Sequence, residues 1–99
     1  MTSFLLSVSP RAEEEALRAA RWYEERSQGL GVAFLETLEQ TLAGIVENPL
    51  RFPLVHQSFR RALMKRFPYG VFFRVRGEQI RISATVHLSR DPDRWRRRS

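Results

Sequence analysis

The C-terminal half of this 99-residue chain is rich in side chains of the types that can act on a phosphodiester, and five of them are candidates for catalysis. These candidate catalytic residues are Lys65, Arg74, Arg81, His87 and Arg90. Guanidinium and ammonium groups can stabilise the charge of a phosphorane, and an imidazole can move protons, so metal-free RNA cleavage is chemically feasible. A lone histidine is more often a surface or hydrogen-bonded structural residue, so the pattern permits a nuclease without requiring one.

The sequence predicts no metal site, no cofactor and no reactive thiol. The chain has no cysteine, which excludes thiolate sites and is ordinary for a protein of the reducing cytoplasm. His56 and His87 lack the spacing of metal ligands, and the only carboxylates of the basic half, Glu78, Asp91 and Asp93, lie on expected turns or ends. No apolar stretch is long enough to span a membrane. We therefore expect a cytoplasmic protein without a cofactor or a membrane partner.

Charge is distributed unevenly between the two halves of the chain. Residues 1–59 carry five Arg against eight Glu, a net charge of −3, whereas residues 60–99 carry eleven Arg and one Lys against three acidic residues, a net charge of +9. Such asymmetry predicts an acidic or nucleic-acid partner for the C-terminal half, although an arginine-rich surface can also serve solubility alone. The residues expected to bind a target or partner are Arg60, Arg61, Lys65, Arg66, Arg74, Arg81, His87, Arg90 and Trp95.

Two helices and four strands must position these side chains. "SFLLSVS" is typical of a first strand, and Ser9-Pro10 begins a helix. The helical pattern breaks in "SQGLG", and a second apolar stripe that begins at Leu30 predicts a second helix, which ends at Asn48, before Pro49. After a proline-punctuated connection, "RRALMKRF", "GVFFRVR" and "QIRISATVH" each show the alternation of a strand. The prediction is a single α+β domain over residues 1–99, in which a helical hairpin covers one face of an antiparallel sheet.

The faces of the last two strands follow from the turn between them. A two-residue turn at Gly77-Glu78 places Arg74 opposite Arg81 on the face away from the helices, where like charges call for an anion or an acidic partner. Strict alternation then adds Ser83, Thr85 and His87 to that open face. On the helix side it places Ile80, Ile82, Ala84 and Val86. We expect His87 and Arg90 to close the open face, Trp95 to pack back on it, and the final "RRRS" to be disordered.

Several segments resemble the toxins of the RelE/ParE superfamily, in the same order along the chain. They are "SPRAEEEALRAARWYEERSQGLGVAFLETLE", "NPLRFP", "RRALMKRFPYGVFFRV" and "HLSRDPDRW", which together cover nearly all of residues 9–97. The most specific pieces are Trp22-Tyr23, residues 29–31, Asn48-Pro49, the "RFPY" of residues 66–69, and His87 with Arg90, Pro92 and Trp95. The resemblance implies the fold already inferred. It also implies a toxin of a type II toxin-antitoxin system that forms a hetero-oligomer with a cognate acidic antitoxin.

The resemblance leaves two activities open and leans toward one of them. ParE-like members inhibit DNA gyrase without cutting anything, whereas RelE-like members cut mRNA on the ribosome with several basic residues and a C-terminal tyrosine. Here the C-terminal aromatic is Trp95, which cannot act as an acid or base, and Lys65 is the only lysine. We therefore expect a ParE-like, non-catalytic gyrase inhibitor. The alternatives are a metal-independent mRNA endonuclease with the ribosome and mRNA as partners, and a non-toxic module that retains the fold.

Overall fold

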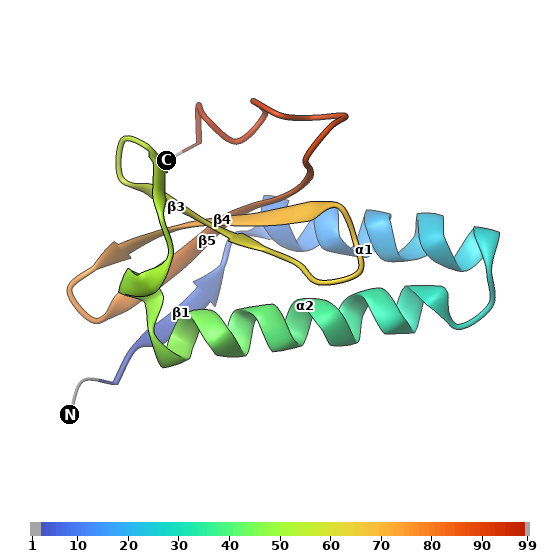
Figure 1. Ribbon diagram of the computed structural model, residues 1–99, viewed down its shortest axis with the longest axis horizontal. Coiled ribbons are helices and arrows are strands. Elements are labelled where there is room, and N and C mark those ends of the chain that lie inside the picture. The colour runs from blue at the N-terminus through green and yellow to red at the C-terminus, as the bar shows by residue number, and fades with distance from the viewer. Residues whose placement is uncertain (1–2, 99) are drawn as a thin grey trace.

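Two antiparallel helices lie against one face of a five-stranded sheet in the computed structural model, which describes residues 3–98 (Figure 1). In chain order the elements are β1 (Leu5–Val8), α1 (Pro10–Arg26), α2 (Leu30–Glu47), the 3₁₀ turn η1 (Pro49–Arg51), β2 (Leu54–His56), β3 (Phe59–Leu63), β4 (Tyr69–Arg76) and β5 (Gln79–His87). The strand order is β1-β5-β4-β3-β2, and only β1 and β5 run parallel. The predicted α+β fold is confirmed. The short strand β2 was not predicted from the proline-punctuated connection.

The helical hairpin begins and turns where the sequence predicts. The Ser9 hydroxyl accepts a hydrogen bond from the Ala12 amide at 3.1 Å, and Pro10 occupies the first turn of α1. Between the helices, Gly29 adopts a φ of 87°, and a Cβ on Gly31 would lie 2.6 Å from the Ala20 carbonyl oxygen. A side chain at Gly31 would therefore force the two helices apart.

An extra residue in β5 changes which side chains face the helices. Arg74 lies opposite Arg81, as the turn predicts, but Phe72 pairs with Ala84 and Phe73 pairs with Ile82, so Ser83 has no partner of its own. A bulge of this kind reverses the alternation from that point onward. The strand therefore changes face at Ser83.

The bulge gives the sheet a hydrophobic core on each face. The first core, toward the helices, contains Ile80 and Ile82, whereas Ala84 and Val86 pack on the second with Phe59, Phe72 and Trp95. The expectation that the four apolar residues of β5 share one face is wrong for this reason. The matching expectation that Thr85 and His87 line the open face with Arg74 and Arg81 is wrong as well.

Residues 88–98 turn back over the sheet on the side away from the helices (Figure 1). Trp95 stacks on Phe72 with ring centroids 4.1 Å apart and an interplanar angle of 13°, and its indole N–H donates to the Pro92 carbonyl at 2.8 Å. The predicted return of Trp95 onto the sheet agrees with this contact. The predicted disorder of "RRRS" is wrong for Arg98, which is buried, while Ser99 lies outside the described residues.

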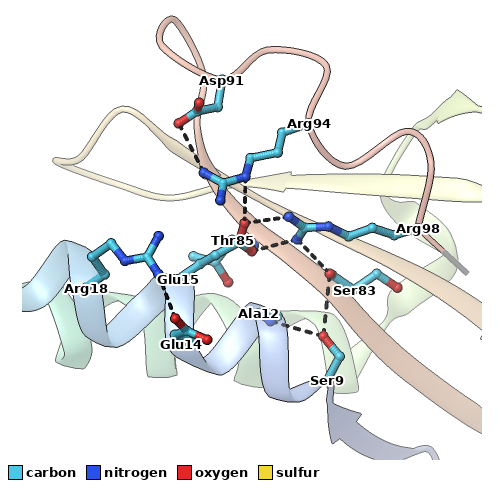
Figure 2. Close-up of polar contacts among 10 residues, drawn as sticks. All are labelled: Ser9, Ala12, Glu14, Glu15, Arg18, Ser83, Thr85, Asp91, Arg94 and Arg98. Carbon is cyan, nitrogen blue, oxygen red and sulfur yellow. Dashed lines mark hydrogen bonds and ion pairs between the residues drawn. The ribbon is translucent and has the colours of Figure 1, made fainter.

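Side chains complete the edge of β5 beyond the end of β1. Within residues 3–98, β1 pairs with β5 only as far as Ile82. The Glu15 carboxylate accepts from the Thr85 amide at 3.0 Å, and the Arg98 guanidinium donates to the Ser83 carbonyl at 3.1 Å. Glu15 and Arg98 also form a two-bond ion pair with both N···O distances at 2.7 Å (Figure 2). A buried backbone group without a partner costs about 1–3 kcal/mol, so this ion pair substitutes for a missing strand.

Candidate functional site

The first candidate site is a hollow beside the β4–β5 turn, on the open face of the sheet. We call it the hairpin hollow, and it is lined by Ser7, Arg74, Arg76, Gln79, Ile80 and Arg81. The Arg81 guanidinium donates to the Ser7 hydroxyl at 3.3 Å, and Arg76 is exposed. Within residues 3–98, none of its three guanidinium groups lies in an ion pair. The hollow therefore offers positive charge to a ligand from outside the chain.

Arg74 is the least available of the three arginines in the hairpin hollow. Its guanidinium donates to the Arg98 carbonyl at 3.1 Å and lies 4.0 Å above the centre of the Phe59 ring. These contacts hold the C-terminal segment against β4. Arg74 consequently has a structural role in addition to its charge.

The second candidate site lies at the other end of β5, on the side of α1. We call it the His87 pocket, and its charged and aromatic lining consists chiefly of Arg18, Trp22, Tyr69, His87, Arg90 and Arg94. Asp91 and the buried Glu15 also border it, so the pocket holds charge of both signs. The structure brings the predicted residues His87 and Arg90 together here, as expected, but separates them from Arg74 and Arg81.

The imidazole of His87 is fixed by the turn that follows β5. Its Nδ1 atom accepts hydrogen bonds from the Ser89 and Arg90 amides at 3.2 and 3.1 Å, so in the neutral ring the proton lies on Nε2. Partial burial and then the positive charge of Arg90 lower the pKa of His87, with Asp91 opposing them. His87 therefore stabilises a turn, and its surroundings favour the neutral ring.

Two aromatic residues that sequence reasoning did not assign to a site complete the His87 pocket. The Arg90 guanidinium donates to the Tyr69 hydroxyl at 3.4 Å and lies 5.2 Å from the centre of the Trp22 ring. Burial raises the pKa of Tyr69, and Arg90 partly offsets that rise. The "WY" and "RFPY" segments marked these positions as family features, but only the fold shows that they meet.

The remaining predicted residues are scattered. Arg60 donates to the Phe52 carbonyl at 2.6 Å and so ties β3 to the preceding loop. Lys65 lines a different hollow, next to α2, and Arg66 is exposed with a φ of 68°. Arg61 is half-buried opposite Phe72 in the sheet.

The predicted binding residues therefore do not form one surface, and Trp95 is not available to a ligand because it is 3 % exposed in the second core.

Within residues 3–98, His, Asp and Glu side chains nowhere gather in a group of three that could hold a metal ion. The helices of the same range include none of the length and apolarity needed to cross a membrane.

Comparison with known proteins places this geometry in context. The family model described as "ParE toxin of type II toxin-antitoxin system, parDE" matches residues 6–92. Among solved structures, one described as the chromosomal ParDE TA system from P. aeruginosa is similar, with a TM-score of 0.74 and 16 % sequence identity. The alignment covers 86 % of this chain and 96 % of that chain, and at this identity it shows the fold alone. No curated protein matches the sequence.

Proposed function

The chain belongs to the ParE toxin family of type II toxin-antitoxin systems, and from that premise we propose that it inhibits growth by binding DNA gyrase and is neutralised by a cognate antitoxin. The observation that carries the proposal is the family match over residues 6–92 of the 99-residue chain. The mechanism is protein binding, with no bond made or broken by the toxin itself.

The dispersal of the five candidate catalytic residues supports binding over mRNA cleavage. Acid–base catalysis requires a proton-transferring group within hydrogen-bond reach of the reacting atoms. His87 and Arg81 lie six residues apart in β5, roughly 20 Å along a strand, and the bulge turns them to opposite faces. Lys65 lines a third hollow, next to α2. These residues do not surround a common phosphate position.

The antitoxin, in this proposal, lies across the helical hairpin and the His87 pocket. A groove between α1 and α2 is lined mainly by apolar residues, among them Leu17, Leu35, Leu38 and Leu42, and Leu17 is 42 % exposed. Glu13 and Glu39 also border this groove. Leu17 lines this groove and the next residue, Arg18, lines the His87 pocket, so the two sites adjoin along α1. An amphipathic acidic segment could place apolar side chains in the groove and carboxylates beside Arg18 and Arg90. The product is a toxin–antitoxin hetero-oligomer.

A supercoiling assay with purified gyrase tests the proposed target. We expect the toxin to inhibit ATP-dependent supercoiling of a relaxed plasmid in a dose-dependent way, and His87→Ala to retain inhibition within about twofold, because no proton transfer is involved. In a parallel reaction, ribosome-bound mRNA that is incubated with the toxin should remain intact.

The opposite pattern would overturn the proposal. If supercoiling is unaffected while ribosome-bound mRNA is cut, and His87→Ala abolishes the cutting, the chain is a nuclease. A thermal melt of the variant, matching that of the native chain, ensures that the comparison concerns function and not folding.

A further inference from the structure

The side chains of the hairpin hollow that can reach a ligand are all hydrogen-bond donors or positively charged groups. The space is about 380 Å³. Arg74, Arg76 and Arg81 supply three guanidinium groups, whereas the single apolar lining residue, Ile80, is fully buried beneath them. The lining residues include no carboxylate. An anion that enters the hollow therefore meets only complementary charge.

The two strands hold like charges against each other in this hollow. Arg74 and Arg81 form a directly opposed cross-strand pair, an arrangement that is destabilising in the absence of a counter-charge. The Arg74 Nε atom is also buried without a hydrogen-bond partner among the described residues. A bound anion would relieve the repulsion between these two guanidinium groups.

The composition of the hollow favours a nucleic-acid backbone over a protein segment. Protein interfaces are organised around an apolar, often aromatic, core, whereas the only apolar residue lining the hollow, Ile80, is fully buried. Interfaces with DNA are more polar and far more positively charged. Single-stranded nucleic acids also need aromatic side chains on which bases can stack, and the lining residues include no aromatic one. Duplex DNA, bound through its phosphates, fits these features best.

The C-terminal segment borders the hollow. The Arg98 carbonyl accepts a hydrogen bond from Arg74, which lines the hollow. Bidentate guanidinium groups suit phosphate oxygens particularly well. Several such groups on one surface match the repeated charges of a DNA strand.

We propose that the hairpin hollow binds phosphate groups of duplex DNA, so that this toxin contacts DNA directly and without regard to sequence. The site lies on the opposite face of β5 from the His87 pocket. It does not depend on the proposed gyrase target, because DNA alone is the ligand.

The test is fluorescence anisotropy with a labelled 20-base-pair duplex of arbitrary sequence, titrated with the toxin alone at several salt concentrations. The double variant Arg76→Ala/Arg81→Ala should bind about tenfold or more weakly at 0.1 M salt, and the slope of log K against log salt should fall by about two. The matched control is Arg11→Ala/Arg21→Ala, which removes the same charge from exposed positions of α1. It should bind as the native chain does.

Three results would overturn the proposal. The first is no binding of the native chain to the duplex. The second is a control variant that binds as weakly as the test variant. The third is polyglutamate that binds as tightly as the duplex through the same two arginines. A duplex preference of at least fivefold over a single strand of equal length is also expected. If the double variant melts early, Arg76→Ala alone carries the test, since the Arg76 side chain makes no described hydrogen bond or ion pair, and it should lower the slope by about one.

Discussion

The two ends of β5 present different chemistry, although both are rich in arginine. The hairpin hollow at the start of the strand holds arginines without a carboxylate partner among the described residues. The His87 pocket at the other end mixes Arg18 and Arg90 with Asp91, Trp22 and Tyr69. The bulge at Ser83 turns the two ends to opposite faces of the sheet. A count of basic residues treats both ends as one surface, whereas the fold makes them two sites suited to different partners.

Between these two ends lies an arginine with an entirely structural role. Arg98 is 9 % exposed and pairs with Glu15, which is 7 % exposed, over the edge of β5 (Figure 2). Three arginine environments thus occur beside β5: arginines without an ion-pair partner among the described residues, arginines next to carboxylates and aromatic rings, and one buried arginine. Only the first two can serve a ligand, and the third holds the strand edge in place.

The largest effect is expected on the stability of the fold, from removal of the Glu15–Arg98 ion pair that lies between the two ends of β5. Glu15→Ala leaves the Arg98 guanidinium without its carboxylate and the Thr85 amide without its acceptor. Removing one partner of a buried ion pair costs about 3–5 kcal/mol, so the urea midpoint should fall sharply. Glu14→Ala is the matched control, because its ion pair with Arg18 is exposed and should be worth less than about 1 kcal/mol. Equal effects of the two variants would show that the Glu15 pair does not support the fold.

An intermediate effect is expected on antitoxin affinity, which should depend on the His87 pocket and not on the hairpin hollow. Arg18→Ala/Arg90→Ala should weaken binding of the proposed antitoxin about tenfold, measured by calorimetry, because two guanidinium groups leave the proposed docking surface. Arg76→Ala/Arg81→Ala should leave antitoxin affinity within about twofold. Because exposed charges are screened within about 10 Å at 0.1 M salt, antitoxin binding should also weaken as salt is added. If both variants weaken the antitoxin equally, the division of partners between the two ends is wrong.

The smallest effect concerns the pH response of the His87 pocket. The folded pKa of His87 lies below its ordinary value of about 6.5, so the unfolded chain binds a proton more readily. Its contribution to stability is therefore full above about pH 6.5 and is lost as the pH falls through the folded pKa. His87→Asn keeps an acceptor for the Ser89 and Arg90 amides but does not titrate, so its thermal melts from pH 7 to pH 5 should show a flatter trend. An unchanged trend would assign the pH response to other groups.

Local signals allowed part of this structure to be predicted. Ser9-Pro10 indicates the start of α1, and the turn at Gly77-Glu78 sets the register that places Arg74 opposite Arg81. The bulge at Ser83 could not be predicted, because the alternation of "QIRISATVH" is intact in the sequence and is broken only by pairing with β4. As a result the sequence predicted one basic face where there are two sites.

The C-terminal segment shows a different limit of sequence reasoning. A run of arginines at a chain end is usually solvated, and nothing near Arg98 in the sequence indicates a buried partner. Glu15, which provides that partner, lies 83 residues earlier on α1. Long-range charge pairing of this kind follows from the fold, not from local pattern.

Pulse-labelling of DNA and protein synthesis within minutes of inducing this toxin without its antitoxin tests the central claim most directly. The account predicts that incorporation of a DNA precursor falls first and that His87→Ala behaves like the native chain. A fall in protein synthesis before DNA synthesis, abolished by His87→Ala, would contradict it and identify the ribosome as the target.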